Sequence, residues 1–286
     1  MSTPAVVLET ARERRRRFAA NNVLVVVCAL IIGLAVFLAL FGPLLAPHDP
    51  DAASLANAYV GPVPGHPLGY DSQGRDLLSR LMAGARTSMV GPFLVVAGSM
   101  ILGSVLAVAA AWAGRWVDAT ISTVLDILFA FPAILLAVLA AAVFGAGLKA
   151  PAIALAIAYT PYIARVLRGA ALRERARDYI AACEVQGLSA TAICARHLIP
   201  NLMPLIVAQA TLTFGYAMVD FAAISFIGLG VQPPTADWGV MVASGQSGVL
   251  QGYPLESLSA GLCIVAVVVA VNLLGERLAA NESEAR

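Results

Sequence analysis

The sequence predicts an all-α protein that crosses a membrane six times. The first observation behind this prediction is composition: 60% of the 286 residues are hydrophobic and only 12% are charged, whereas a soluble domain carries about 25% charged residues. The second is a set of uncharged stretches, several of them longer than the roughly 20 residues that a helix needs to cross the hydrocarbon core. Such continuous apolar runs bond their own backbone groups as helices, and they lack the alternating pattern of a membrane β-barrel.

The chain begins with a basic segment and then a long apolar run. Residues 1–21 include the stretch ARERRRRF, whose five arginines stand directly before the apolar residues 22–45. Basic residues beside a span predict a cytoplasmic tail, and we expect no nucleic-acid partner. The run is too long for the core of a signal peptide, so it predicts a retained anchor. Pro43 and Pro47 are expected to end this first span.

A loop follows the first span. Residues 47–74 are rich in Pro, Gly, His and Asp and show no periodicity, so we expect a solvated loop. No ligand set is apparent beside His48 or His66, and the four cysteines lack metal-ligand spacing, so no metal site is predicted. The next stretch, GRDLLSRLMAGAR, predicts an interfacial helix in which Asp76 and Arg80 pair one turn apart.

Five more apolar runs complete the set of spans. They cover residues 87–113, 119–144, 150–164, 201–227 and 257–275. Small residues scattered along the second span predict close contacts between helices. The short fourth span is expected to end at Arg165, where a basic loop begins. The segment between the fifth and sixth spans has no Lys or Arg and is expected to be a loop.

These spans divide the chain into four parts. A cytoplasmic basic tail (1–21) is followed by the first span with its loop and interfacial helix (22–85). The transmembrane core (86–275) contains the basic loop 165–200, and a cytoplasmic tail (276–286) closes the chain. With the N-terminus inside, 14 of the 18 Lys and Arg residues fall on cytoplasmic segments. This bias predicts that both termini are cytoplasmic.

The longest interruption of the apolar pattern is DYIAACEVQGLSATAICARHLIPN, residues 178–201. Residues 179–185 have helical composition, and Gly187 can stop that helix in a left-handed conformation. A second short apolar run, residues 190–195, follows. Two short helices that meet at a glycine predict a compact knob that another protein can grip.

This arrangement resembles the EAA loop of binding-protein-dependent ABC importers, in which EAA is followed after three residues by Gly and, further on, by I-x-LP. Here the glutamate position holds Ala181 and the second alanine position holds Cys183, while the spacing from Gly187 to Pro200 is kept. The resemblance implies contact with an ATPase through Ala181, Ala182, Cys183, Glu184, Gly187, His197 and Pro200.

Three further blocks widen the resemblance: FGPLLAPHDP, HPLGYDSQGRDLLSRLMAGARTSM and SFIGLGVQPPTADWGVM. They resemble the second, C-type permease subunit of dipeptide, oligopeptide and nickel importers. The resemblance implies a type I ABC importer permease fold in the cytoplasmic membrane of a prokaryote, surrounded by lipid. It implies a homologous second permease subunit, two ATPase subunits or domains and an extracytoplasmic solute-binding protein. Dipeptides or oligopeptides are the implied cargo, with nickel or a metal chelate as the alternative.

The chain carries no motif for chemistry of its own. It has no GxxxxGK[ST], HExxH or GxSxG sequence, so we predict a transport subunit that is not an enzyme and holds no cofactor. The resemblance places ATP and Mg²⁺ in the partner ATPase subunits.

Two carboxylates lie within predicted spans. A charge at the centre of a span costs about 2.5 to 3.5 kcal/mol, so neither is expected to face lipid. Asp126 falls in the first turns of its span, near the cytoplasmic face, and Asp220 lies deeper, one position before the acidic residue of the family pattern. Each is either a structural carboxylate or part of the pathway. Both are also the proton sites of an alternative function, an ion-coupled secondary transporter. Such carriers usually have two related halves, and no halves repeat here, so we favour the importer.

The charge bias makes the topology testable. In a cysteine-free background, Thr235→Cys is expected to react with an impermeant maleimide outside intact cells, whereas Ser189→Cys is expected not to react. Labelling of both positions from the same side would contradict the six-span topology.

Overall fold

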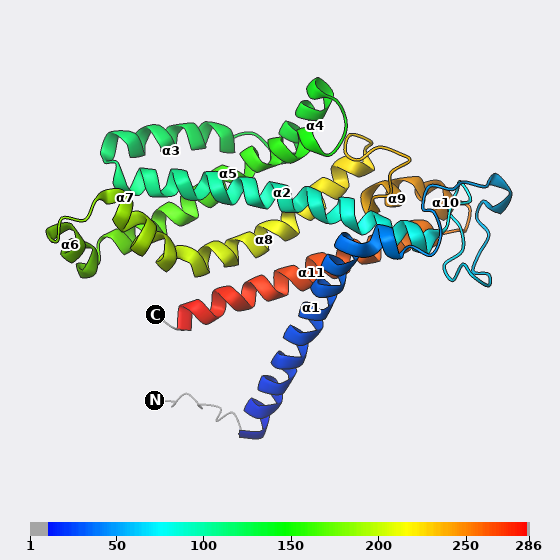
Figure 1. The fold of residues 1–286 in the computed structure, drawn as a ribbon, viewed down its shortest axis with the longest axis horizontal. Coiled ribbons are helices and arrows are strands. Elements are labelled where there is room, and N and C mark those ends of the chain that lie inside the picture. The colour runs from blue at the N-terminus through cyan, green and yellow to red at the C-terminus, as the bar shows by residue number, and fades with distance from the viewer. Residues whose placement is uncertain (1–10, 285–286) are drawn as a thin grey trace, which may run out of the picture.

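The computed structural model describes residues 11–284, and side chains are described for residues 23–277. The described chain is helical (Figure 1). The long helices are α1 (Ala11–Leu45), α2 (Leu77–Trp112), α3 (Arg115–Phe129), α4 (Ala133–Phe144), α5 (Lys149–Arg175), α8 (Ile199–Phe226) and α11 (Leu255–Glu284). The short elements are η1 (Leu55–Asn57), α6 (Asp178–Val185), α7 (Ala190–Ile193), the π-turn η2 (Cys194–Leu198), α9 (Trp238–Ser244) and α10 (Gln246–Leu250).

Five helices of the described residues are long and apolar enough to cross a membrane, and there are six spans if a bent pair of helices counts as one. The pair is α3 and α4, whose axes meet at 78°. The prediction of one continuous helix over residues 119–144 is therefore wrong. Pro132 stands at the break, where it has no N–H to donate and disfavours a helical conformation at Phe131.

The predicted interfacial helix is also wrong as a separate element, because its residues form the first turns of α2. Asp76 does not pair with Arg80. Its carboxylate caps α2 by accepting a hydrogen bond of 2.8 Å from the backbone N–H of Ser79. The Arg80 side chain is 1% exposed, and it donates to the Pro50 carbonyl at 2.9 Å. Asp71 lies 3.5 Å from the same guanidinium group.

The predicted end of the fourth span at Arg165 is too early, because α5 continues to Arg175. Arg165 and Arg168 form ion pairs with Asp126 and Asp118 of α3. Because these carboxylates pair with the two arginines, the helix continues past both positions. The first turns of the predicted basic loop are thus the last turns of a span. Likewise, the segment predicted as a loop before the sixth span contains α9 and α10.

At the termini, helices extend into the predicted tails. α1 begins at Ala11 and α11 reaches Glu284. The remainder of both tails lies outside the described residues.

α2 lies at the centre of the packing, and its small residues make the close contacts that the sequence predicted. A methyl group added at Gly91 would lie 2.8 Å from the Phe221 ring of α8, and one at Gly98 would lie 2.9 Å from Ala156 of α5. α2, α5, α8 and α11 run along the long axis of the molecule (Figure 1). The hinge between α6 and α7 lies at one end, which we call the knob end. α9, α10 and residues 46–76 lie at the other, the loop end.

Irregular chain at the loop end is fastened by buried charges. The carboxylate of Asp71 accepts a hydrogen bond of 2.6 Å from Arg75 Nε, and both side chains are almost fully buried. Asp237 caps α9 and also accepts from the Ser88 hydroxyl of α2 at 2.8 Å. Burial raises the pKa of Asp237, although Ser88 and backbone amides lower it in part. The bond of Asp237 to Ser88 ties α9, which is distant in sequence, to the N-terminal third of α2.

The expectation that no ligand set surrounds His48 and His66 is wrong. The loop folds so that both imidazoles stand beside Asp76 at the start of α2. Asp76 is 10 residues from His66 and 28 residues from His48 in the sequence. The segment that contains them has no periodicity from which these contacts could be predicted.

The close approach of α2 to α5 yields a stability prediction. Gly103→Ala would place a methyl group 2.6 Å from Ile163 Cγ2 and 3.2 Å from the backbone nitrogen of Ala164. We expect it to destabilise the purified protein by about 1 to 3 kcal/mol. Gly33→Ala is the matched control, because nothing lies within 4 Å of the added methyl group on α1. Thermal unfolding in detergent measures both variants, and equal midpoints would contradict this packing.

Candidate functional site

The knob has the predicted construction, a pair of short helices joined at Gly187. α6 ends at Val185, and Gly187 takes a φ of 78°, the left-handed conformation that glycine adopts without strain. Its N–H donates to the carbonyl of Glu184 at 3.0 Å, and Leu188 N–H donates to Cys183 at 3.2 Å. These bonds satisfy carbonyl groups at the helix end. Ser189 then caps α7 by accepting from the Ala192 N–H.

Most of the predicted contact residues lie on the outer surface of the knob. Five of the seven are exposed, namely Ala181, Ala182, Glu184, Gly187 and Pro200. Cys183 and His197 are partly buried, and Pro200 is exposed at the start of α8. Inside the knob, Ile180 and Ile193 are fully buried. The small exposed residues Ala181, Ala182 and Gly187 leave room for another protein to approach the backbone closely.

Val185 is a feature of this surface that sequence reasoning missed. Its side chain is 89% exposed although it is apolar, and it is the last residue of α6. An isolated exposed apolar residue is ordinary on a protein surface. Here it stands two residues before Gly187, at the tip of the knob, where contact with a partner would bury it. Its place just before the glycine is the signal that could have found it.

A polar network holds the base of the knob, and sequence reasoning missed this too. Glu174, at the end of α5, is 5% exposed. Its carboxylate accepts from the Tyr179 hydroxyl at 2.8 Å and from the Asn201 amide at 3.2 Å. Asn201 also donates to the Tyr179 oxygen at 2.8 Å. Arg177 lies 3.1 Å from the same carboxylate. Burial, and then the bond to Glu174, raises the pKa of Tyr179. The network joins α5, α6 and α8.

The knob is continuous with α8. The π-turn η2 follows α7 directly, and α8 starts at Ile199 with Pro200 in its first turn. Pro200 has no N–H to bond the turn before it, and it follows directly on the π-turn, where the regular α-helical hydrogen bonding is already interrupted. His197, in the π-turn, meets the Tyr179 ring edge-on at 6.3 Å. A displacement of the knob would therefore act on α8 without an intervening loop.

Asp126 does not lie in the first turns of its helix, as the predicted span had placed it. It lies near the C-terminal end of α3, with its side chain 66% exposed. The Arg165 guanidinium lies 2.5 Å from its carboxylate and also stacks over the Phe129 ring at 4.4 Å. Asp126 is therefore a paired, accessible carboxylate on the face shared by α3 and α5.

Asp220 has a hydroxyl partner. The Tyr159 hydroxyl of α5 donates to its carboxylate at 2.8 Å. Phe221, which occupies the acidic position of the family pattern, is 2% exposed and packs on Gly91. A carboxylate at position 221 would meet the contact between α2 and α8, whereas Asp220 is directed to α5.

An open hollow lies between these two charged sites. This hollow has a volume of about 430 Å³ and lies where α5, α8 and the break between α3 and α4 meet. A separate, apolar hollow between α4 and α5 has a volume of about 740 Å³. The smaller hollow is lined by aromatic side chains, namely Phe129, Phe131, Tyr159, Tyr162 and Tyr216. Tyr159 connects it to Asp220, and Phe129 connects it to the ion pair of Arg165. The lining of this hollow thus combines ring faces and hydroxyl groups, and two of its residues contact charged side chains outside it.

The network at the base of the knob is testable. Tyr179→Phe removes a hydroxyl that donates to Glu174 and accepts from Asn201, which is expected to weaken the attachment of α6 by about 1 to 2 kcal/mol. Hydrogen exchange of residues 178–187 is expected to become faster. Tyr253→Phe, at the loop end, is the control that should leave this exchange unchanged. Identical protection in Tyr179→Phe and the unmodified chain would show that the network does not hold the knob.

Comparisons with known proteins agree with this geometry. Residues 79–281 match the family model of the binding-protein-dependent transport system inner membrane component, and residues 11–62 match the N-terminal TM domain of oligopeptide transport permease C. The dipeptide transport system permease protein DppC of Alkalihalophilus pseudofirmus is 37% identical, over 90% of this chain and 84% of its own.

Two further similarities point the same way. The di/tripeptide transport system permease protein DppC of Pseudomonas aeruginosa is 39% identical, over 87% of this chain and 84% of its own. A solved inward-facing structure of the MetNI methionine ABC transporter matches 70% of this chain and 94% of its own with a TM-score of 0.57 and 21% identity, so the fold is shared. The chain belongs to the family of binding-protein-dependent transport system inner membrane components, and its fold is that of an ABC importer permease.

Proposed function

We propose that this chain forms half of the translocation pathway of an ATP-driven peptide importer and couples to its ATPase subunits through residues 178–200. The observation that carries the proposal is the exposed pair of helices around Gly187, joined to both α5 and α8. Family membership supports the transport class. The names of the relatives, which are permeases for dipeptides and for di/tripeptides, favour peptides over nickel or a metal chelate.

The partners follow from what the chain itself lacks. It has no phosphate-binding motif of its own, so ATP and Mg²⁺ would be bound by two ATPase subunits or domains. Each would receive one knob in a cleft on its surface. A homologous second permease would close the pathway, and a solute-binding protein would dock at the loop end. The knob end then faces the cytoplasm, in agreement with the bias of Lys and Arg.

Coupling would proceed through rigid elements. ATP favours the closed state of the ATPases because it binds that state more tightly. Closure would move the knob, and the polar network of Glu174 and the π-turn would pass that movement to α5 and α8. Rotation of these helices against the second permease would open the pathway alternately to each side.

The aromatic hollow gives this pathway a surface suited to peptides. A peptide with free termini carries one positive and one negative charge, and its side chains vary in polarity. The ion pair of Asp126 with Arg165, the carboxylate of Asp220 and the intervening rings offer matching contacts. A face with these charges is costly to expose to lipid, which supports its placement against the second permease.

The alternative of an ion-coupled carrier makes a different use of the same residues. In a carrier, Asp126 and Asp220 would bind the protons that drive transport. In an importer they contact cargo or stabilise helices, and ATP supplies the energy. The partners Arg165 and Tyr159 account for both carboxylates without a proton cycle. Family membership favours the importer.

The coupling surface is tested with Gly187→Leu. A side chain at this positive φ is strained by about 1 kcal/mol, and its added bulk points into open space where the ATPase would lie. We expect uptake of a labelled dipeptide by the reconstituted complex to fall about tenfold or more, equivalent to about 1.4 kcal/mol of lost coupling. The ATPases are expected either to dissociate or to hydrolyse ATP without uptake. Ala182→Asp should act alike, because it places a desolvated charge in the contact.

Two sets of controls separate coupling from folding and from proton transport. Gly252 has a similar positive φ, 88° against 78° at Gly187, and equally open surroundings at the loop end, so Gly252→Leu should leave ATPase binding unchanged. Asp126→Asn and Asp220→Asn should reduce uptake less than the knob variants. Normal uptake in Gly187→Leu and Ala182→Asp, together with loss of proton-driven uptake in either carboxylate variant, would replace the importer with the carrier.

A further inference from the structure

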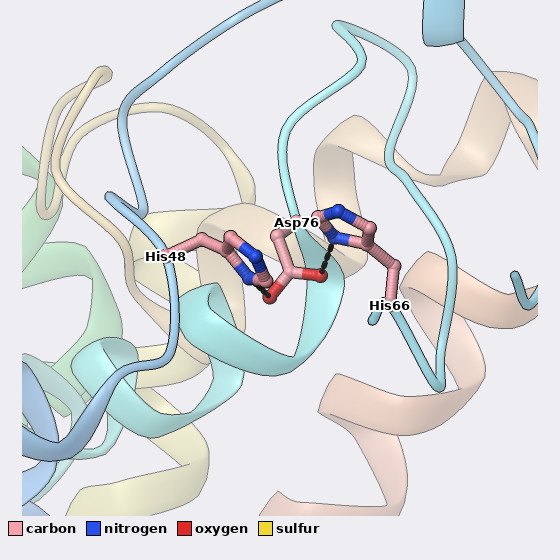
Figure 2. A group of neighbouring side chains, drawn as sticks. All are labelled: His48, His66 and Asp76. Carbon is pink, nitrogen blue, oxygen red and sulfur yellow. Dashed lines mark hydrogen bonds and ion pairs between the residues drawn. The ribbon is translucent and has the colours of Figure 1, made fainter. Parts of the chain in front are cut away.

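Three side chains from separate segments of the loop end converge beside the start of α2 (Figure 2). His48 comes from the chain after α1, His66 from a tight hairpin, and Asp76 from the residue that caps α2. His66 Nδ1 lies 2.8 Å from Asp76 Oδ1, and His48 Nδ1 lies 3.8 Å from Asp76 Oδ2. One ligand atom from each of the three residues lies within 4.8 Å of the other two.

Backbone contacts hold the three residues in place. The backbone N–H of His48 donates to the Ser79 hydroxyl at 3.1 Å, and that hydroxyl donates to Asp76 Oδ2 at 2.6 Å. His66 is fixed by paired backbone bonds with Val63, and its ring lies against Tyr70 at 4.5 Å. The ligand atoms are therefore brought together by ordered chain and not by chance contact of flexible side chains.

Asp76 is suited to bind a cation. Its side chain is only 3% exposed. Its carboxylate accepts hydrogen bonds from the hydroxyl and the backbone N–H of Ser79 and lies 2.8 Å from His66 Nδ1. Oδ2 is engaged by Ser79, whereas Oδ1 receives only the His66 N–H. Oδ1 is thus the oxygen that is free to change partner without loss of the helix cap.

His48 lacks the hydrogen bond that a purely structural role would give it. Its Nδ1 is directed towards Asp76, yet 3.8 Å is too long for a hydrogen bond, and its ring makes no hydrogen bond to any other described residue. The two imidazole rings are stacked, with centroids 4.1 Å apart. The stacking places the ring nitrogens of both imidazoles on the same side of the cluster as the Asp76 carboxylate.

We propose that His48, His66 and Asp76 form a site for a divalent transition-metal ion of the Zn²⁺ class. Imidazole nitrogen and carboxylate oxygen are ligands that Zn²⁺ prefers, at about 2.0 to 2.2 Å, and two such ligands on a tetrahedral ion lie about 3.4 Å apart. The 2.8 Å between His66 Nδ1 and Asp76 Oδ1 would open by about half an ångström, and His48, whose ligand atom lies within 4.8 Å of the other two, would move in towards them. His48 is 42% exposed, which leaves its ring room to move and the fourth position accessible to water.

Binding requires a change of tautomer and no net chemistry. For Nδ1 of His66 to bind the metal in place of its contact with Asp76, the imidazole proton must sit on Nε2. The ion would then join the chain after α1, the hairpin at His66 and the first turn of α2. The bound ion would thus stabilise the loop end by cross-linking these three segments. This site is independent of cargo and of the ATPase contact.

The test is metal titration of the full chain in lipid nanodiscs, purified without a histidine tag and treated with a chelator. Zn²⁺ binding is measured by calorimetry, and Co²⁺ serves as a spectroscopic substitute with visible absorption in tetrahedral sites. We expect one saturable site. His48→Ala and Asp76→Asn should each weaken binding by about tenfold or more, since each removes a ligand or its charge.

The variants are chosen so that folding does not confuse the result. His48 is half-exposed, and Asn replaces Asp76 as an effective helix cap. His197→Ala, at the knob end, removes the third histidine of the chain and should leave the affinity unchanged. Equal zinc affinity in His48→Ala and the unmodified chain would overturn the proposal. So would the absence of a saturable site, which would leave the cluster as a hydrogen-bonded helix cap.

Discussion

The close approach of α2 to α5 and α8 is the contact on which the rest of the structure depends. Glycines at positions 91, 98 and 103 let these helices meet at distances that no side chain on α2 would allow. In lipid, where burial of apolar surface contributes little to helix association, such shape fit supplies much of the stability. Because the three helices run along one axis, this contact also fixes where their ends lie. The knob end and the loop end owe their positions to it.

The two ends of the molecule differ in how many of their charged side chains are buried. At the loop end, Asp71, Arg75 and Arg80 are buried and paired, so they order irregular chain around the start of α2. At the knob end, a single buried carboxylate, Glu174, anchors a surface whose outer residues are small or exposed. The first arrangement is suited to a fixed platform. The second is suited to an element that is held at its base and gripped at its tip.

The sequence analysis succeeded where local signals determine the structure. Gly187 and the short helices on either side were predicted correctly, because helix composition and a left-handed glycine act within a few residues. The five unbroken apolar helices were located for a similar reason, since apolar length is a local property. The bend at Pro132 was missed because a proline inside an apolar run kinks some helices and breaks others.

Contacts between distant segments were beyond local reasoning. Arg165 was predicted to end its helix, since the sequence does not show that Asp126 of α3 stands opposite it. The network of Glu174 with Tyr179 and Asn201, and the cluster around Asp76, depend on how loops fold back. Their residue types are common in loops, and only their position in space gives them meaning.

The continuity of the knob with α8 sets how far the knob stands from the bilayer. The helical path from Ala190 to Phe226 contains 37 residues, which at 1.5 Å per residue spans about 55 Å. The hydrocarbon core is only about 30 Å thick. If the far end of the rod lies near the opposite surface, its near end projects through the headgroups into water. A partner of any size can then bind the tip without displacing lipid, and a small tilt of the rod in the membrane becomes a larger sweep at the tip.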